Sequence, residues 1–478
     1  SHAAACPTGT DAAPTAGCKI ETTGIDYTLT GNITTTGDSA YGLWLFGGNY
    51  NNTNITGDIS TGNVGGITGI AASGLLLQFS NYNTTTLTGD ISTTGHSASG
   101  LLLTISNNNT TTLNGGISTT GDNAFGLFLN DSTNNTTTLT GGITTTANAA
   151  YGLFLLESTN NTTTLAGGIS TGNVDGTTGT SADGLFLNDS TNNTTTLTGG
   201  ITTTGDSAYG LYLNNSSNNT TTLTGDISTG NVDGTRGFDA YGLYLLNSNY
   251  NTTTLTGDIS TTGTNADGLF LSGSHNNNTT LTGGISTTGN GAYGLVLFGS
   301  NYNTTTLTGD ISTGNVGGTT GTSAYGLFLL SSHNNTTTLT GGITTTGDDA
   351  PGLVLLSSDN NTTTLTGDIR TTGDDAPGLL LTNSNNNTIS LGGKVTASHG
   401  TAYSAYFHET SDNNILAFGR GSTFITDYYN DGTGNTLDFT NLGRAASYNY
   451  DWTVDGIGGA VTGTDFLLTD ANKPLVEG

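Results

Sequence analysis

Aromatic side chains recur at one position of a repeated segment, directly after a Gly-Leu pair, where they could bind a partner surface. Rings bring large contact areas to interfaces. A continuous exposed apolar face is unusual on soluble monomers, so the stripe predicts a docking face. The alternative is that Asn-rich loops or a neighbouring segment cover it. This interaction stripe comprises Trp44, Phe128, Phe154, Phe186, Tyr212, Tyr244, Phe270 and Phe328.

Pairs of threonines in a Thr-x-Thr pattern form a second candidate surface. Threonine is also a favoured residue on ordinary strand surfaces, and that is the simpler interpretation. A regular Thr-x-Thr grid nevertheless resembles the water-ordering faces of ice-binding β-solenoids. The residues concerned include Thr138, Thr140, Thr196, Thr198, Thr222 and Thr224.

Catalytic and metal-binding patterns are weak. The segment "TGDIS" places Asp58, Asp90 and their equivalents in several turns, and carboxylates could hold calcium, although a solvated edge charge is the simpler interpretation. His96, His275 and His333 are far apart along the repeats. We therefore expect no enzymatic activity, no metal site and no cofactor, with calcium as the open alternative. The Asn-x-Thr sequons, such as that at Asn135, would accept glycans only in a suitable secretory host.

Composition and charge restrict the partners. The 478 residues include 75 glycines, only 9% charged residues and a formal net charge of −28, with seven Lys and Arg in all. Such a chain has no basic stripe for phosphate backbones, so nucleic acid is excluded as an expected partner. No apolar run has the roughly 18 residues that a membrane helix requires.

The two cysteines, Cys6 and Cys18, precede the repeats within "CPTGTDAAPTAGC". We expect them to form a disulfide, because the rest of the chain has the character of an extracellular protein. Two free thiols in a cytosolic protein are the alternative. The small residues of "SHAAAC" are typical of the site left after a signal peptide is cleaved.

A repeat organises nearly the whole chain. Gly-Leu recurs at spacings of 26 or 32 residues from Gly42 to Gly378, and the extra six residues always fall in one place. After each glycine the first and third residues are Leu, whereas the second and fourth vary. This period of two predicts a strand with one buried face. The sequence therefore predicts an all-β solenoid of about 14 turns, in which equivalent residues stack on one another and paired Asn form corner ladders.

Three regions follow from this pattern. We expect an N-terminal cap with the disulfide at 1–26, solenoid repeats at 27–393, and degenerate repeats with a C-terminal cap at 394–478. The caps would protect the open strand edges at each end.

Repeats such as "ITTTGDSAYGLYLNNSSNNTTTLTGDI" resemble the passenger domains of bacterial autotransporters. The resemblance implies a right-handed parallel β-helix at the bacterial cell surface, with roles in adhesion, aggregation or surface structure. Members of that family continue into a membrane β-barrel that this sequence does not include. The resemblance therefore implies either a passenger released by cleavage or a solenoid exported by another route.

Together these features predict a secreted or cell-surface structural solenoid that associates with itself, laterally or head to tail, into fibres or a layer. The alternatives are an adhesin that binds a host surface or glycans, and an ice-binding protein that uses the threonine array.

Overall fold

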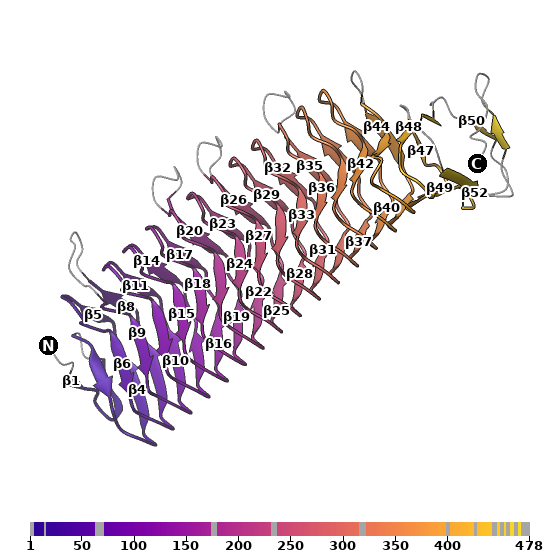
Figure 1. The fold of residues 1–478 in the computed structure, drawn as a ribbon. Helices are drawn as coiled ribbons and strands as arrows, with labels where there is room; N and C mark the ends of the chain where they lie inside the picture. The colour runs from indigo at the N-terminus through magenta and orange to yellow at the C-terminus, as the bar shows by residue number, and fades with distance from the viewer. Residues whose placement is uncertain are drawn as a thin grey trace. The chain divides into compact units, whose positions relative to one another are not determined.

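The computed structural model describes residues 4–13, 16–62, 71–173, 179–230, 237–314, 322–397, 402–424 and 428–441, and four short strands beyond them. The six extra residues of the longer repeats fall largely outside these ranges. The chain divides into two compact units, Ser1–Thr254 and Leu255–Gly478. Each unit consists of parallel strands that stack turn upon turn in three sheets (Figure 1).

In the first unit the Gly-Leu segments form sheet A, the Thr-rich segments form sheet B, and the Ile-Ser/Thr-Thr segments form sheet C. Sheet A contains β1 (Ala4–Ala5), β3 (Cys18–Ile20), β6 (Leu43–Phe46), β9 (Leu75–Gln78), β12 (Leu101–Thr104), β15 (Leu127–Asn130), β18 (Leu153–Leu156), β21 (Leu185–Asn188), β24 (Leu211–Asn214) and β27 (Leu243–Leu246). Sheet B contains β2 (Gly9–Ala12), β4 (Asp26–Thr30), β7 (Asn52–Thr56), β10 (Thr84–Thr88), β13 (Thr110–Leu113), β16 (Thr136–Leu139), β19 (Thr162–Leu165), β22 (Thr194–Leu197) and β25 (Thr220–Leu223). Sheet C contains β5 (Ile33–Thr35), β8 (Ile59–Thr61), β11 (Ile91–Thr93), β14 (Ile117–Thr119), β17 (Ile143–Thr145), β20 (Ile169–Thr171), β23 (Ile201–Thr203) and β26 (Ile227–Thr229).

The second unit repeats the same three sheets, and β28 (Thr252–Leu255) spans the boundary between the units. Sheet A continues with β30 (Leu269–Ser272), β33 (Leu295–Phe298), β36 (Leu327–Leu330), β39 (Leu353–Leu356), β42 (Leu379–Thr382), β45 (Ala405–Phe407), β48 (Tyr428–Asn430) and β51 (Val454–Asp455). Sheet B continues with β31 (Asn278–Leu281), β34 (Thr304–Leu307), β37 (Thr336–Leu339), β40 (Thr362–Leu365), β43 (Thr388–Leu391), β46 (Ile415–Phe418), β49 (Asn435–Asp438) and β52 (Gly459–Thr462). Sheet C continues with β29 (Ile259–Thr261), β32 (Ile285–Thr287), β35 (Ile311–Thr313), β38 (Ile343–Thr345), β41 (Ile369–Thr371), β44 (Lys394–Ala397) and β47 (Thr423–Phe424), while β50 (Ser447–Asn449) pairs with β53 (Leu467–Thr469).

The strand register matches residues of the same type in successive turns. In sheet A, Leu127 pairs with Leu153 and Phe128 with Phe154, and in sheet C, Ile117 pairs with Ile143. All of the pairings in the described part of the chain are parallel, and the chain forms a right-handed parallel β-helix. The fold class predicted from the repeat is therefore confirmed.

The core of each unit is an aliphatic column. Leu127 and Leu129 from sheet A, Leu139 from sheet B and Ile143 from sheet C have no more than 1% of their surface exposed. The same positions are buried in the other described turns, so the leucines that flank each variable position face the interior, as predicted. Each buried aliphatic side chain contributes about 1.5–3 kcal/mol relative to exposure.

Buried asparagines stabilise the corner between sheets A and B. The amide Nδ2 of Asn135 donates to the Oδ1 of Asn161 at 3.1 Å and to the carbonyl oxygen of Ser106 at 2.7 Å. Its own Oδ1 accepts from the backbone N–H of Asn109 at 2.9 Å. The predicted corner ladder is confirmed, and because Asn135 is only 1% exposed, its amide is not accessible to a glycan in this fold.

The glycine of each Gly-Leu pair is required by close packing. A Cβ atom at Gly126 would lie 2.2 Å from Cγ2 of Ile143 and 2.6 Å from the carbonyl oxygen of Gly152. The left-handed corner positions are instead occupied mainly by Asn, Asp and Ser, such as Asn134 at φ 56°. Side chains of this kind tolerate that conformation because they hydrogen-bond locally.

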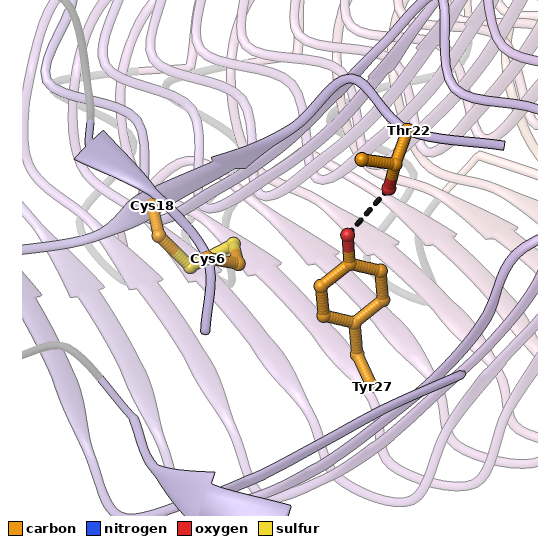
Figure 2. Close-up of a disulfide and its surroundings, with 4 residues drawn as sticks. All are labelled: Cys6, Cys18, Thr22 and Tyr27. Carbon is orange, nitrogen blue, oxygen red and sulfur yellow. Dashed lines mark hydrogen bonds between the residues drawn. A yellow bond between two sulfur atoms is a disulfide. The ribbon is translucent and has the colours of Figure 1, made fainter. Parts of the chain in front are cut away.

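The N-terminal segment is covalently closed and already follows the sheet pattern. Cys6 and Cys18 form the predicted disulfide, with Sγ atoms 2.09 Å apart (Figure 2). β1 pairs with β3, and β2 pairs with β4. The hydroxyls of Thr22 and Tyr27 form a hydrogen bond near the disulfide (Figure 2).

Candidate functional site

The aromatic stripe of the first unit is a column of stacked rings on the outer side of sheet A. Phe128, Phe154, Phe186, Tyr212 and Tyr244 follow one another with centroid separations of 4.7–5.0 Å and interplanar angles of 4–6°. The turn spacing of about 4.8 Å imposes this separation, which is within the range of favourable stacking. We call this stack the stripe column.

A second aromatic column covers one side of the stripe column. It is formed by the residue immediately before each Gly-Leu pair, which is Phe125, Tyr151, Tyr209 or Tyr241 in four of the turns. These flanking rings pack edge-on: Phe125 against Phe154 at 5.3 Å, and Tyr209 against Tyr212 at 4.9 Å. We call this the flanking column. It was not recognised in the sequence, although an aromatic residue before Gly-Leu in "AFGL" and "AYGL" marks it.

The two columns cover each other, so the stripe is less exposed than expected. Phe154 is 6% exposed, and Phe186 and Phe328 are each 8% exposed. Trp44, Phe128, Tyr212, Tyr244 and Phe270 are half-buried. The stripe faces outward as predicted, but it is not a continuous exposed apolar face, since three of its eight rings are buried. Its cover comes from neighbouring rings, not from Asn-rich loops.

A buried carboxylate interrupts the flanking column in the first unit. Asp183 occupies the position between Tyr151 and Tyr209 and is 3% exposed. Its Oδ1 accepts a hydrogen bond from the backbone N–H of Tyr209 at 2.8 Å. Burial raises the pKa of Asp183 well above its usual value, which that hydrogen bond partly opposes. Burial, and then the charge of Asp183, raise the pKa of Tyr151 to about 12.

In the second unit the two columns contain smaller residues. Val296, Phe328 and Val354 form a buried outer cluster, against which Tyr293 and Tyr325 pack. The flanking position then changes to Pro351 and Pro377 in two consecutive turns before it returns to Tyr403. Tyr403 and Tyr406 begin a further group of rings, in which Tyr406 stacks on Tyr429 at 4.9 Å.

Four exposed apolar side chains of the first unit lie at one corner after sheet A, whereas exposed Phe238 and Tyr250 lie farther along the chain. Tyr50 is 62% exposed, Tyr82 51%, Phe79 45% and Ile105 43%. The rings of Tyr50 and Tyr82 stack at 4.9 Å, and Phe79 packs edge-on against Phe46 at 5.9 Å. We call Tyr50, Phe79, Tyr82 and Ile105 the corner patch.

The backbone of the corner patch is left-handed at all four residues, with φ between 49° and 58°. Most other turns place a small or polar residue at these positions, for example Asp131 and Asn134, although Tyr250 and Tyr302 repeat the tyrosine. Bulky residues rarely adopt this conformation, and strain of this kind concentrates at functional sites. The sequence contains a signal for the two tyrosines, since "NYN" replaces "NNN" or "TNN" in their turns, but the patch was not predicted.

The predicted threonine face is on the outer side of sheet B. Thr140, Thr198 and Thr224 are exposed, and Thr138, Thr196 and Thr222 are half-buried. Exposed Thr136, Thr194 and Thr220 at the start of the same strands add a third column that the prediction omitted. Parallel pairing aligns these columns, as in Thr136↔Thr162 and Thr138↔Thr164.

The acidic and histidine positions take part in ladders. The Oδ1 of Asp90 accepts from the backbone N–H of Gly116 at 2.7 Å. The Nδ1 of His275 accepts from the N–H of Asn301, and that of His333 from Asp359, both at 3.0 Å. Within the described residues no group of three or more His, Cys, Asp or Glu side chains is placed to hold a metal ion.

The class of protein defined by this geometry is a parallel β-solenoid with aromatic and threonine columns on its outer faces. No family model matches the chain, and no similar curated protein or solved structure was found. In the described part of the chain, no helix has the length and hydropathy of a membrane span.

Proposed function

We propose that this protein is an extracellular structural β-solenoid that associates with further copies of itself into fibres or a surface layer. The resemblance of its repeats to autotransporter passengers supports a location at the bacterial cell surface. The Cys6–Cys18 disulfide is in keeping with an oxidising compartment. The proposed role is structural and not enzymatic, which agrees with the use of the acidic and histidine side chains in ladders.

The corner patch is the observation that supports association most strongly. Its four apolar side chains are exposed in three successive turns, although the fold accepts Asn and Asp at the same positions. None of the four carries a charge, whereas the chain as a whole carries −28. A second copy would bury the patch against an apolar surface, and salt would promote association by screening the repulsion between the acidic chains.

Sedimentation velocity and negative-stain electron microscopy test this proposal. The patch variant is Tyr50→Asn, Phe79→Asp, Tyr82→Asn and Ile105→Asn, which introduces residues that other turns already use at these corners. We expect wild-type protein to form assemblies that grow with salt, and the variant to remain monomeric. The control variant is Tyr250→Asn, which changes a tyrosine corner outside the patch and should still assemble.

Two outcomes would overturn the proposal: wild-type protein that remains monomeric at all salt concentrations, or a patch variant that assembles as wild type does. Monomer that binds cells or glycans through the patch would instead support an adhesin.

An ice-binding role is a second candidate, and the three aligned threonine columns favour it. Thr136 and Thr138 pair with threonines in the turns before and after them, whereas Asn114 and Ala166 interrupt the column of Thr140. If the face orders water, the protein should show thermal hysteresis, and Thr138→Tyr should abolish it. Absence of hysteresis in the wild-type protein would eliminate this candidate.

A further inference from the structure

A hollow opens on the second unit where both aromatic columns are interrupted. Pro351 and Pro377 stand where the flanking column has rings in other turns. In the same two turns, Val354 and Leu380 occupy the positions of the stripe column. The resulting hollow has a volume of about 280 Å³. Besides the two prolines and Leu380, it is lined by Tyr325, Asp349, Asp375, Tyr403 and Tyr406.

The hollow has aromatic walls and an apolar floor. Tyr325 forms one wall, and Tyr403 with Tyr406 forms the other. Three turns separate Tyr325 from Tyr403, which corresponds to about 14 Å along the stack at the usual strand spacing. Neighbouring rings support each wall, since Tyr325 packs on Phe328 at 5.1 Å and Tyr403 on Tyr429 at 5.3 Å. The walls are therefore held in place without a ligand.

The charged groups that line the hollow are all acidic. Asp349 and Asp375 are exposed at equivalent corners of consecutive turns, about 5 Å apart along the stack. No Lys or Arg side chain is among the lining residues. Burial, and then the carboxylate of Asp349, raise the pKa of Tyr325, and burial followed by Asp431 raises that of Tyr406. The site therefore has a negative potential and offers mainly hydrogen-bond acceptors.

From this geometry we infer that the hollow binds a small organic cation with a short apolar body, and that a linear diamine fits it best. Two ammonium groups would face the carboxylates of Asp349 and Asp375, and the alkyl chain would lie on Pro351 and Pro377. The tyrosine faces attract cations through the ring quadrupole. A neutral sugar carries no charge for the two carboxylates to attract, so the acidic lining favours a cation. This inference does not depend on self-association.

Isothermal titration calorimetry at low salt with 1,4-diaminobutane tests the inference. We expect a Kd of about 1 mM or tighter, which is realistic for a ligand of this size. Butylamine should bind about tenfold more weakly, because it reaches only one carboxylate. 1,4-Butanediol, which has the same length without charge, should show no binding.

Variants locate the site. Asp349→Asn with Asp375→Asn should weaken binding at least tenfold. Pro377→Tyr should do the same by filling the hollow with the residue that other turns carry. Asp239→Asn is the matched control, since Asp239 occupies the equivalent corner beside the filled columns of the first unit and should leave binding unchanged. Circular dichroism melting would establish that each variant remains folded.

Three results would overturn the inference: no heat of binding with either amine, equal binding of diamine by wild type and Pro377→Tyr, or equal affinity for calcium and the diamine. The last result would show that acidic charge alone attracts ligands. Binding of a neutral disaccharide in preference to the diamine would assign the hollow to sugars and would also contradict it.

Discussion

The aromatic columns of the two units show how one strand register produces either a closed or an open surface. From Phe125 to Tyr244 in the first unit, most turns contribute a ring to one or both columns, and Phe154 and Phe186 are buried although they face outward. Around Pro351 and Pro377 in the second unit, two consecutive turns lack rings, and a hollow results. Because side chains stack directly on their equivalents, the exposure of each ring depends mainly on the turns above and below it.

Removal of one ring should destabilise the first unit more than a comparable truncation in the second. Phe154→Ala removes a buried ring with partners on both sides, so we expect a loss of about 3 kcal/mol. Leu380→Ala, at the edge of the hollow, should cost about 1 kcal/mol, since the side chain is half-buried. Hydrogen exchange at amides of β18 and β42 would measure both local effects. Equal losses would contradict the difference between the units.

The carboxylate that interrupts the flanking column should make the first unit sensitive to pH. Burial raises the folded-state pKa of Asp183 above the unfolded value of about 3.9. Its contribution to stability is therefore complete below that pH and is lost as the pH rises through the folded-state pKa. Asp183→Asn removes the buried ionisable group but keeps an acceptor oxygen for the N–H of Tyr209. The substitution should therefore stabilise the unit at neutral pH.

The same substitution should have little effect at about pH 3, where the aspartate is protonated in both states. Thermal melts at the two pH values would measure the difference. Asp239→Asn, at a half-buried corner, is the control. An equal effect of Asp183→Asn at both pH values would show that its ionisation does not limit stability.

A ring introduced beside the hollow should make the second unit resemble the first. Of the three predicted changes in stability, this one should be the smallest. Val354→Phe would stack on Phe328, as Phe154 does on Phe186. Aromatic pairs contribute about 0.5–1.5 kcal/mol beyond the area that they bury, so we expect a gain of about 1 kcal/mol. Hydrogen exchange in β36 and β39 would report it. A loss of stability would mean that the outer cluster is already fully packed at Val354.

The repeat was sufficient to predict the solenoid, because a constant spacing with Leu in alternate positions has few other solutions. It also predicted the asparagine ladder, since one amide per turn at one corner must meet its equivalents. The exposure of the stripe was not predictable from that position alone, because Phe125 and Tyr151 lie before the glycine and cover the rings from the side.

The corner patch and the hollow depend on departures from the repeat. Tyr50 and Tyr82 replace Asn, and Pro351 and Pro377 replace Tyr. A pattern search averages over such differences, whereas the structure shows that consecutive departures stack and form a surface.

Hydroxyl-radical footprinting of dilute monomer tests the central claim, that neighbouring rings cover the stripe column whereas the corner patch is exposed. Phe154 and Phe186 are 6% and 8% exposed, whereas Tyr50 and Tyr82 are 62% and 51% exposed. After correction for intrinsic reactivity, we predict rapid modification of both tyrosines and strong protection of both phenylalanines. Modification of Phe154 and Phe186 at rates similar to those of Tyr50 and Tyr82 would contradict the account.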